Sequence, residues 1–186
     1  MNAALTPAEL TLLGLLVERP RHGYELEEVI SARGMREWTT IGFSSIYYVL
    51  GKLRDRGLVT EVESQHSGRG RARKVFAPTA AGRSACADAT EAALAELRPT
   101  LPPVLVGLAN LPVLSPERVE SALTQRAESL AERIAAVSEA SATQTELPDF
   151  VRAIFDHALS QLHAEQAWLS TYRTTLVHAA QGGAQL

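Results

Sequence analysis

The stretch FSSIYYVLGKLRDRGLVTEVESQHSGRGRARKVF, residues 43–76, is the most informative part of this chain. Ile46, Leu50 and Leu53 recur within it at positions i, i+4 and i+7, which is the spacing of residues that share one face of a helix. The stretch therefore predicts a short helix whose apolar face packs inward and whose opposite face carries small polar side chains and tyrosines.

The rest of this stretch has the pattern of a hairpin. Gly57 suits the end of the helix, residues 58–63 read as one strand, and Lys74–Ala77 read as the returning strand. Between them, a glycine-containing tip carries closely spaced basic residues. A helix followed by a basic hairpin is typical of a winged helix-turn-helix, in which the helix reads the DNA major groove and the wing touches the backbone.

Helices are expected on both sides of this stretch. Thr6 and Pro7 predict the start of a first helix, and His22-Gly23-Tyr24 predicts the start of a second. The predicted fold is mainly α with a small β-hairpin: an N-terminal winged helix-turn-helix followed by a C-terminal antiparallel helical dimerisation domain. The expected parts are a DNA-binding domain at 1–83, a connecting helix and Pro-containing hinge at 84–112, the dimerisation domain at 113–180 and a disordered tail at 181–186.

Charge is divided unevenly along the 186 residues. The net charge is −3, but residues 1–83 hold 12 Lys and Arg against nine Asp and Glu, whereas residues 84–186 hold six against 12. A weakly basic first part and an acidic second part suit a DNA-binding domain joined to a protein-association domain, although chance could also produce this split. No run of about 18 apolar residues is present, so we expect no membrane span. With one cysteine and no signal-peptide pattern, the expected location is cytoplasmic.

The chain also resembles the PadR family of transcriptional regulators. The resemblance rests on L-T-x-x-E-L-x-x-L-G-L-L at 5–16, H-G-Y-E-L at 22–26, S-S-I-Y-Y-V-L-x-K-L-x-x-x-G-L-V at 44–59 and K-V-F-x-P-T-x-x-G at 74–82. It implies a homodimeric regulator, usually a repressor, that binds an inverted-repeat operator in double-stranded DNA. It also implies release by a small aromatic or amphipathic effector, and C-terminal helices that form the dimer.

Candidate DNA contacts come from three places. The predicted recognition helix offers hydroxyl groups and an ammonium group, the wing offers cations, and the start of the second helix offers backbone N–H groups. Each has an ordinary alternative: a solvated helix face with Tyr47 packed against the first helix, a solubilising hairpin, and core packing of Tyr24. The full set is His22, Tyr24, Ser44, Ser45, Tyr47, Tyr48, Lys52, Arg69, Arg71, Arg73 and Lys74.

The remaining candidates are aromatic residues that could line an effector pocket. Trp38, Trp168 and Tyr172 could stack on an aromatic ligand, or they could be core residues of the domain and the dimer. We find no catalytic motif, no metal-ligand spacing and no sign of a cofactor, so we expect neither an enzyme nor a metal site. Cys86 is expected to be a small, buried residue, with redox sensing as the alternative. The alternatives to a repressor are an activator of the same fold and a winged-helix protein-interaction module without DNA binding.

Overall fold

A computed structural model describes residues 4–37, 39, 41–42, 45–62, 74–97, 99, 101–143 and 148–182. The chain divides into two compact units, Met1–Pro99 and Thr100–Leu186, and each is described by itself. This division falls inside the segment 84–112, which the sequence marks as a connecting region. Among the described residues, no helix is both long and apolar enough to cross a membrane.

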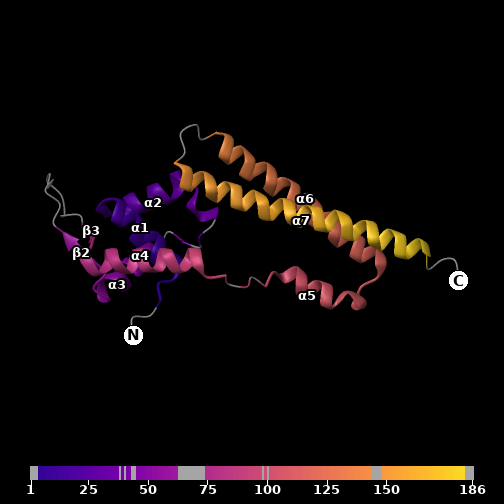
Figure 1. The fold of residues 1–186 in the computed structure, drawn as a ribbon, viewed down its shortest axis with the longest axis horizontal. Coiled ribbons are helices and arrows are strands. Elements are labelled where there is room, and N and C mark those ends of the chain that lie inside the picture. Colours follow the sequence, from indigo (N-terminus) through magenta and orange to yellow (C-terminus); the bar gives the residue numbers. More distant parts are fainter. Residues whose placement is uncertain are drawn as a thin grey trace. The chain divides into compact units, whose positions relative to one another are not determined.

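The first unit combines helices with a small antiparallel sheet (Figure 1). Its elements, in chain order, are α1 (Pro7–Glu18), β1 (Arg21–His22), α2 (Gly23–Ala32), the 3-10 helix η1 (Met35–Glu37), α3 (Ser45–Asp55), β2 (Val59–Val62), β3 (Val75–Pro78) and α4 (Ala80–Ala95).

The start of α1 is fixed by a reciprocal cap, as the sequence predicts. The Glu9 N–H donates to Thr6 Oγ1 at 3.2 Å, and the Thr6 N–H donates to Glu9 Oε2 at 2.8 Å. Pro7 occupies the first turn, where a missing N–H costs nothing. The cap satisfies two N–H groups that would otherwise lack a partner, so α1 begins at one defined residue.

The core of this unit lies among α1, α2 and α3. Ile46, Leu50 and Leu53 of α3 are all buried, which confirms the inward face that their spacing predicts. They pack in one cluster with the buried side chains of α1 and α2 and with the first residues of β2. Because this face holds α3 against the rest of the unit, the opposite face of the helix is left for solvent.

The sheet has one strand more than the sequence predicts. Strand β3 lies in the centre, with β2 on one side and β1 on the other. Arg21 pairs with Phe76 and His22 pairs with Val75. Strand β1 was not predicted, because two residues between Pro20 and a helix are too few to show an alternating pattern.

Gly57 and Thr79 shape the turns on either side of the hairpin. Gly57 has φ +70° and ends the turn after α3, as expected for a helix C-terminus. Thr79 caps α4, since its Oγ1 accepts the Gly82 N–H at 3.0 Å. Helix α4 ends at Ala95.

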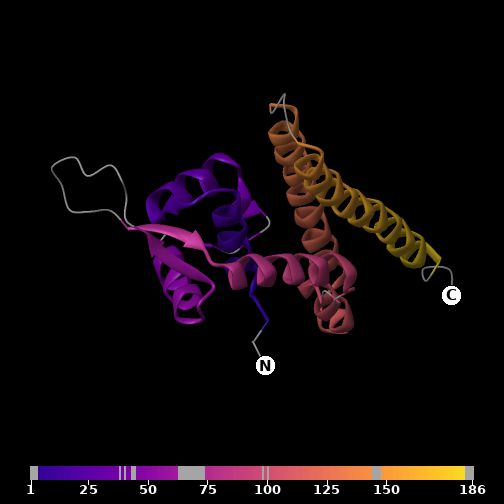
Figure 2. The same ribbon diagram turned by 60° about the vertical axis from the view of Figure 1, so that its left-hand side comes forward.

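The second unit is built on two long helices, α6 (Pro116–Ala142) and α7 (Asp149–Gly182), which lie side by side in both views (Figures 1 and 2). The short helix α5 (Pro103–Ala109) and the 3-10 turn η2 (Leu111–Val113) precede them. Leu123, Leu130 and Leu169 form the centre of the contact between α6 and α7. The pairing of these two helices is therefore as expected from their apolar stripes. The expected tail at 181–186 falls mostly outside the described residues, and Gly182 is the last residue of α7.

Candidate nucleic-acid interface

Helix α3 presents aromatic and basic side chains on its outer face. Tyr47 and Tyr48 are 58% and 64% exposed, values unusual for side chains of this size. Lys52, one turn after Tyr48, places Nζ 4.8 Å from the centre of the Tyr48 ring. No described carboxylate forms an ion pair with Lys52, so its charge is available to an anionic partner.

Ser45 has a structural role as well as a place on this face. Its Oγ donates to the Gly42 carbonyl at 2.7 Å, and its backbone N–H donates to the same carbonyl at 3.0 Å. The hydroxyl hydrogen is thus used in the turn that precedes α3, while the oxygen lone pairs stay free to accept a hydrogen bond.

Tyr47 joins α3 to the beginning of α2. A Cβ built on Gly23 would lie 2.6 Å from both Cε1 and Cζ of Tyr47, so the ring in this position lies directly against Gly23. Tyr47 therefore packs on the first residue of the second helix. Because the ring rests on Gly23 and remains more than half exposed, Tyr47 both packs and faces outward.

His22 joins α2 to the wing. Its Nδ1 lies 3.1 Å from the Lys74 carbonyl oxygen, and since a carbonyl only accepts, Nδ1 is the donor. The His22 ring stacks on Tyr24 with centroids 5.5 Å apart and an interplanar angle of 12°. The His22 backbone N–H donates to Glu25 Oε2 at 2.6 Å, so a carboxylate already occupies this helix start.

The first residue after the wing tip is held by ion pairs. Lys74 Nζ lies 2.8 Å from Glu61 Oε2, and Arg54 Nη1 lies 3.0 Å from Glu61 Oε1. Lys74, and then Arg54, hold the pKa of the Glu61 carboxyl below its usual range. The same contact, together with Asp55, raises the pKa of Arg54. Both pKa shifts favour the charged forms of Glu61 and Arg54.

The structure thus connects several of the expected residues into one surface of the first unit. Tyr47 touches Gly23, the next residue His22 bonds to Lys74, and Lys74 pairs with Glu61. Sequence reasoning did not single out Gly23, Arg54 or Glu61, although Arg54 follows Tyr47 at i+7 and so shares its face. The residues Trp38, Ser44, Arg69, Arg71 and Arg73 lie outside the described part of the chain.

The aromatic candidates of the second unit belong to a helix contact. Trp168 and Tyr172 stack on each other with centroids 5.5 Å apart, and both pack against the cluster around Leu169. A cavity of about 430 Å³ on the same helix pair is lined by other residues, among them Arg173 and Val177. The structure therefore gives both aromatic side chains a packing role.

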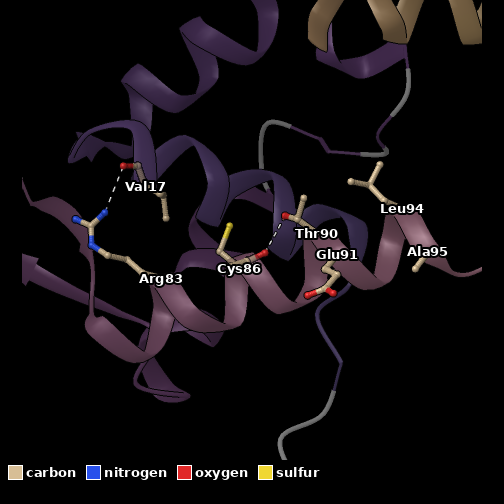
Figure 3. A pocket seen from close by; sticks show the side chains of 8 residues that line it. Val17, Arg83, Cys86, Thr90, Glu91, Leu94 and Ala95 are labelled. Atoms are coloured by element: carbon tan, nitrogen blue, oxygen red, sulfur yellow. Dashed lines mark hydrogen bonds between the residues drawn. The ribbon is translucent and has the colours of Figure 1, made fainter.

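A shallow apolar groove lies on the first unit, along α4 (Figure 3). It encloses about 660 Å³, and its lining includes Val17, Cys86 and Leu94. Arg83 closes one end, where its Nη1 reaches the Val17 carbonyl at 3.5 Å. Burial raises the pKa of the Cys86 thiol, and the Thr90 hydroxyl offsets part of that effect. The sequence predicts a small, buried Cys86, whereas the side chain is only partly buried against the core, and the sequence gave no signal for the groove.

Comparison with known proteins identifies the first unit. The sequence model of the Transcriptional regulator PadR-like family matches residues 12–88, which run from α1 into α4. Residues 12–88 are therefore PadR-like in sequence. No curated protein sequence matches the chain.

Solved structures are similar to this chain in fold across both units. Bacillus subtilis PadR in complex with operator DNA is 18% identical, with a TM-score of 0.71 over 90% of this chain and 98% of that one. The same protein in complex with p-coumaric acid is 17% identical, with a TM-score of 0.72 over 90% and 97%. The Vibrio cholerae virulence activator AphA is 21% identical, with a TM-score of 0.73 over 92% and 99%.

The TM-scores establish the fold, which is that of PadR-like transcriptional regulators. The winged helix and the paired C-terminal helices occur together in it, as the sequence predicts. The family whose model matches residues 12–88 is one of transcriptional regulators. Among the described residues, no three His, Cys, Asp or Glu side chains gather where they could hold a metal ion.

Proposed function

We propose that this chain is a sequence-specific, DNA-binding transcriptional regulator, a homodimeric repressor that binds an inverted-repeat operator and responds to a small effector. The observation that carries the proposal is the outer face of α3, where Tyr47, Tyr48 and Lys52 are exposed beside the base of a basic wing. Exposed tyrosines and a lysine that no described carboxylate pairs, all on one helix, suit hydrogen bonds to phosphates and base edges.

The wing adds a second contact to the same duplex. Lys74 stands at the base of the wing, and Arg69, Arg71 and Arg73 precede it in sequence. Cations at this place suit phosphate contacts, which give affinity without sequence preference, while α3 supplies the preference. The contacts of Tyr47 with Gly23 and of His22 with the Lys74 carbonyl support the proposal, because they hold α3, α2 and β3 in one arrangement.

Dimerisation is proposed from the second unit. Helices α6 and α7 bury one shared stripe, yet Phe150 and Val177 of α7 remain 68% and 51% exposed. A second copy of the chain would cover such residues. Two copies of α3 would then enter successive major grooves about 34 Å apart, which requires an inverted-repeat operator.

The comparisons support the choice of partner and leave the direction of regulation open. Bacillus subtilis PadR has been solved with operator DNA and with p-coumaric acid, which supports DNA and a small aromatic acid as partners here. AphA is an activator with the same fold, so an activator is the second candidate.

Binding to DNA is tested by fluorescence anisotropy with duplex from upstream of the chain's own gene and with random duplex, over a range of salt concentrations. We expect tighter binding to the upstream duplex and a steep loss of affinity with salt. Absence of binding to either duplex at low salt would refute the proposal and favour a protein-interaction module.

Variants test which surface is used. Lys52→Ala should weaken binding and lower the salt slope by about one. Arg71→Ala should weaken binding to all sequences about equally. Arg118→Ala removes the same charge from α6 and is the matched control. Lys52 and Lys74 are the only lysines of the chain, so amine labelling with and without DNA gives a direct footprint, with the N-terminal amine as internal reference.

A further inference from the structure

Three charged side chains meet between the recognition helix and the wing. Glu61 of β2 is the central group, with Arg54 of α3 at 3.0 Å and Lys74, just before β3, at 2.8 Å. Arg54 also bonds to Asp55, at 3.1 Å. All of these contacts are open to solvent, since the Arg54 and Lys74 side chains are 47% and 65% exposed.

The two cations lie on the surface proposed to face DNA. Arg54 continues the row of Tyr47 and Gly51 along α3 at the i, i+4, i+7 spacing. Lys74 adjoins the basic tip of the wing, and its carbonyl accepts from His22. Glu61 thus stands between the two DNA-contacting elements with a negative charge.

A carboxylate bound by a guanidinium and an ammonium makes the same bonds that a DNA phosphate would make. Both anions offer oxygen atoms that accept charge-assisted hydrogen bonds from arginine and lysine. A phosphate that approaches this place therefore meets cations that already have an anionic partner, and it meets the charge of Glu61 as well.

We propose that Glu61 is a built-in competitor of DNA phosphate for Lys74 and Arg54, and that it lowers the affinity of the free protein for any duplex. The inference deepens the proposed function and rests on it. Exposed ion pairs are weak, so DNA can displace Glu61 from these cations. The competitor therefore restrains binding without preventing it, and it acts on every DNA sequence alike.

The test is the affinity of Glu61→Gln for random and upstream duplex in the anisotropy assay. The variant keeps the shape and hydrogen-bonding oxygen of the side chain and removes its charge. We expect about three- to tenfold tighter binding to both duplexes at low salt, and we expect the gain to shrink as salt screens the charge. Glu91→Gln, which removes an exposed carboxylate on α4 in the same unit, should leave affinity nearly unchanged.

A double-mutant cycle distinguishes competition by Glu61 for Lys74 from a general effect of the protein's net charge on DNA affinity. While Glu61 holds Lys74, the substitution Lys74→Ala should cost little; in the Glu61→Gln background the same substitution should cost clearly more. Equal costs in the two backgrounds would overturn the inference. Circular dichroism melting of each variant establishes that the protein is folded.

The possible results are distinct. If wild type binds and Glu61→Gln binds equally or more weakly, Glu61 positions the cations instead of competing for them, and only this inference fails. If wild type binds no duplex at low salt, the proposed function fails and the inference fails with it. A gain for Glu61→Gln that Glu91→Gln reproduces would likewise overturn the role of this site.

Discussion

Gly82 is the residue at which a single methyl group should most disturb the first unit. It lies in the first turn of α4, directly against the backbone of Leu58, where α3 turns into β2. A Cβ added there would lie 1.9 Å from the Leu58 oxygen and 2.9 Å from the Leu58 carbonyl carbon. These are backbone atoms, so no side-chain rotation relieves the overlap, and α4 must move away from β2.

The magnitude follows from three terms. Forcing an added group into a packed site costs about 1–3 kcal/mol, and this overlap belongs at the upper end. The displacement also weakens the bond from the Thr79 N–H to the Leu58 carbonyl, 3.0 Å long, and a hydrogen bond contributes about 1 kcal/mol. The higher helix propensity of alanine relative to glycine offsets at most about 1 kcal/mol of this destabilisation. We expect Gly82→Ala to lower the free energy of unfolding by about 3 kcal/mol.

Urea denaturation followed by circular dichroism measures the decrease in the free energy of unfolding. Amide hydrogen exchange over residues 45–62 shows whether α3 and β2 are the elements that lose protection. Gly14→Ala is the matched control, because Gly14 lies inside α1 and an added Cβ meets no atom within 4 Å. That control should be neutral or stabilising by up to about 1 kcal/mol. Equal stability of Gly82→Ala and wild type would refute the packing argument.

Four further predictions concern the rest of the chain. Because the pKa of the Cys86 thiol is raised, little thiolate is present at pH 7.5. We therefore expect the alkylation rate of Cys86 in the folded protein to be lower than in the urea-unfolded protein. The two rates should become similar as the pH rises. Arg173 lowers the pKa of Glu120, so the ionised carboxylate stabilises the second unit above the unfolded-state pKa, and this stabilisation is lost as the pH falls through the folded-state pKa. Glu120→Gln should therefore reduce the dependence of the free energy of unfolding on pH in the acid range, whereas Glu128→Gln should not. Leu169→Ala should cost about 2–5 kcal/mol in thermal or urea unfolding, since Leu169 is 2% exposed. Val177→Ala should weaken the proposed dimer in light scattering more than it weakens folding, and a wild-type monomer at micromolar concentration would contradict the dimer.

Short sequence patterns predicted most helices of this protein, because the features that start, orient and end a helix involve residues close together in the chain. The Thr6 cap, the spacing of Ile46, Leu50 and Leu53, and the positive φ of Gly57 each involve residues within a few positions of one another. Their consequences can be read without knowing what the chain packs against. The same holds for the exposed face of α3, which is the complement of its buried face.

Part of the candidate site could also be predicted in this way. His22, Tyr24, Tyr48 and Lys52 were chosen from their places at a helix start or on an outward helix face, and the structure leaves Tyr48 and Lys52 open to solvent. Their contact with DNA remains a prediction.

The sequence alone determined the order of the elements, the inward faces of the helices and the division of charge, because periodicity, caps and composition act over short distances. Only the tertiary structure decided that β1 joins the sheet, that Gly82 meets Leu58 and that Glu61 takes Lys74 and Arg54 as partners. In each of these cases the groups come from different elements. Such contacts depend on how the elements pack, and no short-range pattern in the sequence encodes them.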